Sequence, residues 1–220
     1  MERILAGSVA LRVVHTAVPE DAHRLDALLD LGRADLLAEG AEQLRTLNVD
    51  AAMWACTSGS FVFGWDGARE QVEDLGKLLD APASSTSFAF VEAARRLDVR
   101  RVGVAATYPR DVAGYFVEFL RRGGLDVVHL SVGDIVTADE VGGHGRDAVF
   151  DLVAEGDHPD AEAVLVPDTA LRTVAWLDEL ENRAGKPVLT ANQVSVWWGL
   201  RLAGDDTPRP GAGALFRRSR

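Results

Sequence analysis

One short stretch of the sequence combines a thiol, three hydroxyls and a glycine, and reads Cys56-Thr57-Ser58-Gly59-Ser60. It follows an apolar run that predicts a β-strand, so the thiol is expected at a strand end, near a helix N-terminus. The unpaired N–H groups there favour a thiolate, which makes the sulfur a nucleophile or a base. The nearby hydroxyl and backbone donors suit an anionic substrate or a developing enolate. The alternative is a buried, inert cysteine, the usual state of an isolated cysteine.

A second candidate group is Asp168, which also follows a predicted strand and precedes a threonine, Thr169. Residues 162–169 align with residues 50–57 at an offset of 112, so Asp168 is the counterpart of Cys56. If the two halves face each other, the thiol and the carboxylate approach one substrate from opposite sides and could act as an acid/base pair. Alternatively, Asp168 caps the helix that is expected to start near Leu171.

The elements that must position these groups alternate between short β-branched runs and longer helical stretches. Strands are predicted at residues 11–16, 51–55, 101–106, 125–130, 163–167 and 187–190. Helices are predicted at residues 33–47, 67–79, 87–97, 110–122, 138–154, 171–183 and 194–202. This alternation predicts an α/β fold with parallel sheets and helices on both faces.

A second repeat supports a division into two lobes. The segments that begin near Pro82 and Pro187 align at an offset of 105 residues, and each predicts a proline-led strand. We therefore predict two similar α/β lobes, the first formed by residues 1–86 and 193–220 and the second by residues 87–192. Ligands of open α/β sheets bind in the crevice at the carboxyl ends of the strands, which is where both candidate groups are expected.

Charge and composition exclude several classes of function. The chain has 220 residues with 34 acidic and 23 basic side chains, a net charge of −11, which disfavours nucleic-acid binding. No apolar run approaches the ~20 residues of a membrane helix, and no secretory signal is seen at the start, so we expect a cytoplasmic protein. The single cysteine rules out an internal disulfide framework. The histidines lack metal-ligand spacing and no phosphate-binding loop is present, so we expect no metal and no cofactor.

Several motifs, taken in order along the chain, resemble those of the maleate cis-trans isomerase and arylmalonate decarboxylase family, within the Asp/Glu racemase superfamily. They lie at residues 56–62, 82–87, 102–109, 169–173, 185–193 and 200–204, and span most of residues 8–204. The resemblance implies two flavodoxin-like lobes related by a pseudo-twofold axis, with a cleft between them. It also implies cofactor-free proton transfer at the carbon next to a carboxylate, and we expect a homo-oligomer that acts on a small carboxylate.

The resemblance assigns roles to individual residues. In maleate isomerases the first cysteine is thought to add to the substrate double bond, and Cys56 lies at that position. Tyr108 matches a tyrosine that binds the substrate carboxylate. Thr57, Ser58 and Thr169 match the hydroxyl and backbone donors around that group.

Three departures from the family pattern bear on the reaction. Asp168 replaces the second cysteine, whereas arylmalonate decarboxylases keep that cysteine and lack the first. The family usually opens with a strand and a Pro-Ser-Ser-Asn-like turn, which this sequence lacks, so either the start lies upstream or the first lobe is remodelled. A second asparagine is not seen near residues 137–140. With both asparagines missing, the case for maleate itself as the substrate is weakened.

The expected function is therefore a cofactor-independent isomerase or racemase that acts next to a carboxylate. Cys56 would be the nucleophile or base, and Asp168 the opposing acid/base group or an orienting carboxylate. Three alternatives stay open: an arylmalonate-type decarboxylase, an ectoine-utilisation-type protein that acts on an amino-acid derivative, and a catalytically silent homologue that binds a carboxylate.

Overall fold

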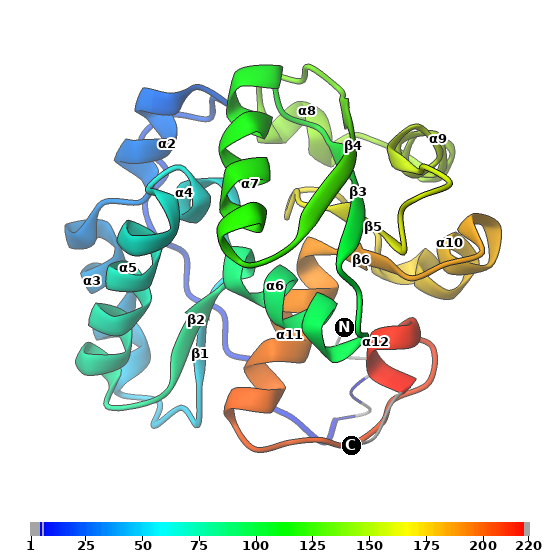
Figure 1. Cartoon of the computed structure of the whole chain (residues 1–220). Helices are drawn as coiled ribbons and strands as arrows, with labels where there is room; N and C mark the ends of the chain where they lie inside the picture. Colours follow the sequence, from blue (N-terminus) through cyan, green and yellow to red (C-terminus); the bar gives the residue numbers. More distant parts are fainter. Residues whose placement is uncertain (1–4, 6, 218–220) are drawn as a thin grey trace.

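Two parallel β-sheets organise the chain in the computed structural model, which describes residue 5 and residues 7–217 (Figure 1). The smaller sheet pairs β1 (Ala52–Trp54) with β2 (Ala83–Ser85). The larger sheet has the order β4 (Asp126–Val132), β3 (Arg101–Ala106), β5 (Ala163–Val166) and β6 (Val188–Thr190). All paired strands are parallel, which confirms the α/β class.

The central position of β3 follows from its sequence. Val102, Val104 and Ala105 are fully buried, as expected of a strand with a neighbour on each side and helices on both faces. Val104 pairs with Leu165 of β5. The residues that follow β3 and those that follow β5 therefore emerge level with each other at one edge of the sheet.

Two helices lie between the sheets (Figure 1). α6 (Thr86–Arg96) follows β2, α11 (Ala191–Leu202) follows β6, and the two pack against each other. α11 contacts β1 and β2 as well as β6, so it joins the two halves. The predicted division after residues 86 and 192 falls near the starts of these helices, and we keep it as a proposal.

The remaining helices pack around these elements. α3 (Ala34–Arg45) and α5 (Gly64–Leu79) pack together beside the smaller sheet, and α9 (Arg146–Gly156) packs on the larger one. The others are α2 (Leu25–Leu31), α4 (Ser58–Phe61), α7 (Arg110–Arg122), α8 (Ala138–Gly142), α10 (Leu177–Ala184), α12 (Ala214–Arg217) and the 3-10 turn Val174–Trp176. In the described part of the chain, no helix combines the length and apolar character that crossing a membrane requires.

Three element predictions are wrong. Residues 11–16 form no strand: Leu11 and Val14 are partly buried, but Val13 is 74% exposed and no strand pairs with the segment. The helix expected over residues 138–154 is two helices, α8 and α9, because glycines interrupt it at residues 142–145. The helix expected from residue 171 begins only at Leu177, after a 3-10 turn.

Candidate active site

The loops that follow β3 and β5 meet through two side-chain hydrogen bonds. Thr107 Oγ1 donates to Asp168 Oδ2 at 2.5 Å, and Tyr108 Oη donates to the carbonyl oxygen of Pro167 at 3.0 Å. Both contacts follow from the register, which places Thr107 level with Asp168. Thr107, Tyr108 and Asp168 are all at most 4% exposed, so the cluster is enclosed by protein.

Asp168 occupies a turn, and the alternative interpretation, in which it caps a helix that starts near Leu171, does not hold. Its Oδ1 accepts a hydrogen bond from the backbone N–H of Ala170, two residues further on, and no helix begins at Leu171. The short side chain thus accepts a hydrogen bond from a backbone N–H of its own loop, as aspartates in turns commonly do. With Thr107 on Oδ2 and Ala170 on Oδ1, both carboxyl oxygens are held in one orientation.

Cys56 lies two residues after β1, just before the single-turn helix α4. The backbone N–H groups of Gly59 and Ser58, and the Ser58 side chain, act on its sulfur and lower its pKa. Gly59 is required by space: a Cβ there would lie 2.9 Å from Trp54 Cη2 and 3.3 Å from Cys56 Sγ. The small residues of this motif therefore let the backbone close around the thiol.

The net effect on the thiol is opposite to the one expected from the sequence. Although Cys56 is partly exposed as a residue, burial of its thiol group is the largest effect and raises the pKa to about 11. The negative charge of Asp168 raises the pKa further, and the Gly59 and Ser58 hydrogen bonds offset only part of this rise. The prediction of a stabilised thiolate is therefore wrong, because with this pKa Cys56 keeps its proton at neutral pH.

Tyr108 connects the two candidate groups electrostatically. Burial raises the pKa of its hydroxyl well above the ordinary value, and the charges of Asp168 and Cys56 raise it further. The side chains of Thr57 and Ser58 lower it, so all four residues are close enough to influence one hydroxyl. Tyr108 consequently remains a protonated hydrogen-bond donor at neutral pH.

One hydroxyl at the site makes no hydrogen bond within residues 5 and 7–217. Thr57 is 1% exposed, and its Oγ1 is buried without a hydrogen bond to any described residue. An unsatisfied buried hydroxyl costs free energy, and a ligand that accepts its hydrogen bond removes that cost.

The internal repeat is visible in the contacts of both halves. Ser87, the second residue of α6, donates its hydroxyl to the carbonyl oxygen of Thr57 at 2.9 Å. Asn192, the second residue of α11, donates its amide to the carbonyl oxygen of Thr169 at 2.8 Å. The same offsets of 112 and 105 residues that relate the sequence segments relate these two hydrogen bonds.

Sequence reasoning missed three residues that contact this site. The family resemblance assigns a role to Tyr108 and none to Thr107, although a polar residue directly after β3 could have indicated a partner after the adjacent strand. Ser87 lies in the serine-rich motif at residues 82–87, to which the resemblance assigns no role. His23 has no local signal: its ring packs edge-on against Tyr108 with the centroids 4.9 Å apart, which only the tertiary fold reveals.

Two further observations describe the surroundings. Within residues 5 and 7–217, no group of three or more histidine, cysteine, aspartate or glutamate side chains could hold a metal ion. A cavity of about 150 Å³ lies elsewhere, between α9 and α10, and contains none of the site residues; its lining includes Phe150, Leu180 and Arg183.

These features define a two-lobed α/β protein with an enclosed polar site at the carboxyl ends of its strands. The profile of the arylmalonate decarboxylase family matches residues 32–216. The chain therefore belongs to this family, which confirms the resemblance seen in the sequence.

Individual relatives share the fold at low sequence identity. Arylmalonate decarboxylase of Bordetella bronchiseptica is 30% identical over 141 residues, which cover 63% of this chain and 59% of that protein. The chain thus matches about three fifths of the length of this relative. A crystal structure of maleate isomerase from Pseudomonas putida S16, a cysteine-to-alanine variant with maleate, is similar in fold. The TM-score is 0.84 at 20% identity, and the match covers 90% of this chain and 81% of the isomerase.

A third relative carries chemical information. A Nocardia farcinica maleate cis-trans isomerase, in a cysteine-to-serine mutant, holds a covalently bound succinylcysteine intermediate. Its structure has a TM-score of 0.78 at 23% identity and covers 93% of this chain and 82% of that chain. The relatives are thus isomerases and decarboxylases, and one of them reacts through a cysteine.

Proposed function

We propose that the protein is a cofactor-independent isomerase or racemase that acts at the carbon next to the carboxylate of a small carboxylic acid. One observation carries the proposal: the hydrogen bonds of Thr107 and Tyr108 hold Asp168 and its loop against Tyr108, and Cys56 lies near enough to raise the pKa of the same hydroxyl. Cys56 and Asp168 are two groups able to exchange protons. An acid and a base at one small site are what proton transfer at carbon requires. Membership in a family of isomerases and decarboxylases supports this assignment.

The hydroxyl groups around the thiol are the proposed carboxylate site. Thr57 Oγ1 makes no hydrogen bond within the described part of the chain. Tyr108 stays protonated, and to bind a ligand it would exchange its hydrogen bond to the Pro167 carbonyl for one to the carboxylate. Together with Ser58 and Thr169, these groups would bind the substrate carboxylate and stabilise the negative charge of an enediolate.

In the proposed racemisation, Asp168 removes the proton from the carbon next to the carboxylate, and the C–H electron pair moves into the enediolate. Cys56 then donates its thiol proton to the opposite face of the same carbon, and the new C–H bond completes the inversion. Water returns a proton to the sulfur, and Asp168 releases its proton. The raised pKa of Cys56 supports its role as the acid, since the resting thiol holds the proton that the step uses.

A substrate with a double bond would use the same sulfur differently. The thiol would first pass its proton to Asp168, and the sulfur would add to one alkene carbon while the C=C electron pair moves into the enediolate. After rotation about the resulting single bond, the electron pair would return, expel the sulfur as a thiolate and re-form the double bond, and Asp168 would give the proton back to the sulfur. The succinylcysteine intermediate of the Nocardia farcinica isomerase supports this route for a family member.

Decarboxylation is the second candidate, and the protonated thiol favours it. Loss of CO2 from an activated malonate leaves the C–C electron pair in an enediolate, to which Cys56 would deliver its proton. This reaction needs an acid and no base, so it is compatible with the replacement of the second cysteine by Asp168.

Proton NMR in D2O with a panel of small mono- and dicarboxylates, including maleate, aryl malonates and acylated amino acids, tests these reactions together. Incorporation of deuterium at the carbon next to the carboxylate, with loss of optical activity, identifies a racemase. Conversion of a cis to a trans alkene identifies an isomerase, and loss of CO2 identifies a decarboxylase. Cys56→Ala is expected to reduce turnover by about 10²–10⁴-fold, the usual contribution of a proton-transferring group. Saturable binding without turnover of any substrate would identify a silent homologue and overturn the proposal.

A further inference from the structure

The segment before α2 is fastened to the loop that follows β4. Both carboxyl oxygens of Asp21 accept hydrogen bonds from the backbone of α8, at 2.7 Å from Ala138 N and 3.0 Å from Asp139 N. The backbone N–H of His23 donates to the carbonyl oxygen of Val136 at 2.8 Å. These three bonds place the His23 side chain inside the protein, where the residue is 8% exposed.

One ring nitrogen of His23 makes a hydrogen bond to the backbone, and the other has no hydrogen-bond partner among the described residues. Nδ1 lies 2.8 Å from the carbonyl oxygen of Ile135, and a carbonyl can only accept, so Nδ1 carries a hydrogen. Nε2 makes no hydrogen bond with any described residue. In the neutral ring Nε2 is therefore an acceptor, and in the protonated ring it is a cationic donor. Nε2 is not among the described side-chain atoms that are fully buried and unsatisfied, so it keeps some access to solvent and can be reached by a ligand.

The ring lies directly beside the candidate site. It packs against Tyr108 with the ring planes at 86°, while Phe61 packs against Tyr108 at 5.7 Å between centroids. Tyr108 is in turn held by Pro167 and influenced by Asp168 and Cys56. His23 is thus separated from the proposed reacting groups by a single side chain.

The charge balance of the site gives His23 a role. Asp168 contributes a carboxyl group, and no hydrogen bond or ion pair of the described residues brings a lysine or arginine to Cys56, Tyr108 or Asp168. A carboxylate ligand that entered this site would meet only neutral donors and a group of its own sign. His23 is the neighbouring side chain that can become positive, and Nε2 is the atom that could bind the ligand.

We propose that His23 is a ligand-binding residue of the active site and that, in the complex, the imidazolium form of its ring donates Nε2–H to a carboxylate oxygen of the substrate. The inference deepens the proposed function, since it rests on the ligand being a small carboxylate. The N-terminal segment then contributes to the site itself, and its fastening through Asp21 serves to place the imidazole.

Alkylation of Cys56 tests the proposal without any turnover. Cys56 is the only cysteine in the chain, so the reaction is confined to one atom. Iodoacetate brings a carboxylate to the sulfur, whereas iodoacetamide brings a neutral amide. The ratio of their alkylation rates at one fixed pH therefore reports how well the site accepts a carboxylate. His23→Asn retains an amide donor near the Nδ1 position for Ile135 but has no atom at the Nε2 position.

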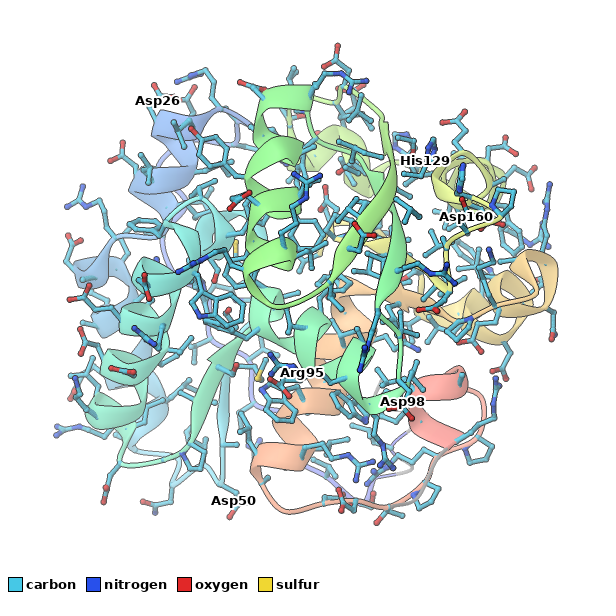
Figure 2. The ribbon with its side chains drawn as sticks, in the orientation of Figure 1. Asp26, Asp50, Arg95, Asp98, His129 and Asp160 are labelled. Atoms are coloured by element: carbon cyan, nitrogen blue, oxygen red, sulfur yellow. The ribbon has the colours of Figure 1, made fainter. Side chains whose placement is uncertain are left out.

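We expect His23→Asn to lower the iodoacetate-to-iodoacetamide ratio about tenfold, the effect of one hydrogen bond to a charged group, with an unchanged melting temperature. His23→Gln places an amide nitrogen near the Nε2 position and is expected to restore most of the ratio. His129→Asn is the control, because His129 is a partly buried histidine of β4 that bonds to the carbonyl oxygen of Glu155 and lies far from Asp26 and α2 in Figure 2. Its replacement is expected to leave the ratio unchanged.

An unchanged ratio in a folded His23→Asn protein would overturn the proposal and leave His23 as a packing residue. If His23→Asn does not fold, failure of a folded His23→Gln protein to keep the wild-type ratio would overturn it. The result is separate from the proposed function: a silent homologue would still show the change in ratio, whereas an active enzyme with an unchanged ratio would bind its substrate without His23.

Discussion

Thr107 Oγ1 donates a 2.5 Å hydrogen bond to Asp168 Oδ2, and this bond joins the ends of two adjacent parallel strands. Thr107 directly follows β3, and Asp168 lies two residues after β5. Because Val104 pairs with Leu165, the register brings the two side chains level at the edge of the sheet. The orientation of the proposed base is therefore set by strand pairing.

Thr107→Val tests this hydrogen bond, because valine keeps the shape of the threonine side chain and removes the hydroxyl donor. We expect the free energy of unfolding to fall by about 1–3 kcal/mol, because a buried carboxyl oxygen loses its partner. Turnover of the substrate identified by NMR should fall more than tenfold, because the Asp168 carboxyl group is no longer held in one orientation by Thr107. Thr107→Ser, which keeps the hydroxyl, should retain most of both. Denaturant unfolding and steady-state kinetics measure the two effects, and wild-type values for valine would contradict the assignment.

The reactivity of Cys56 should depend on pH in a defined direction. Only the thiolate reacts with iodoacetamide, so the rate should rise with pH toward a midpoint at about 11. Asp168→Asn removes a negative charge that disfavours the thiolate and should lower that midpoint. A stopped-flow titration of both proteins measures the shift. A wild-type midpoint near the free-thiol value of ~8.5, or an upward shift in the variant, would show that burial and Asp168 do not control the sulfur.

Gly59→Ala tests the space around the thiol. The added methyl would lie 2.9 Å from Trp54 Cη2 and 3.3 Å from Cys56 Sγ, so the ring or the loop must move. We expect a loss of about 1–3 kcal/mol of stability, typical of overpacking, and a changed rate of Cys56 alkylation. Gly114→Ala in α7 is the control: a Cβ there meets nothing within 4 Å, and the helix should gain about 0.5–1 kcal/mol. Equal effects at both glycines would argue against a tight loop.

The paired helix starts offer a test of the repeat. Ser87→Ala removes the donor to the Thr57 carbonyl, and Asn192→Ala removes the donor to the Thr169 carbonyl together with a 3.3 Å bond to the Leu171 carbonyl. Each variant should lose about 1 kcal/mol of stability, with the larger loss at Asn192. Cys56 alkylation should change in the Ser87 variant and stay near wild type in the Asn192 variant. Urea unfolding and alkylation rates measure this, and a reversed pattern would separate Ser87 from the thiol loop.

Much of the architecture was predictable because its signals are local. β3 was predicted to the residue, since its run is apolar on both faces and could only be a central strand. α7 was also predicted to the residue, because Pro109 precedes it and Gly123 with Gly124 follows it. The loop that became α4 escaped prediction, as a single turn is too short for helical periodicity. The break between α8 and α9 was missed because the flanking sequence continued a helical pattern through the glycines.

By itself, the sequence determined which residues could do chemistry: the repeat paired Cys56 with Asp168 because both halves carry the same order of strand, loop and helix. The tertiary structure alone decided how those residues behave. The pKa of Cys56 depends on burial and on a carboxyl group 112 residues away along the chain, and both effects reverse the expectation drawn from a nearby helix start. The contact of His23 with Tyr108 is likewise a product of packing, since no local pattern specifies which distant ring a buried histidine will meet.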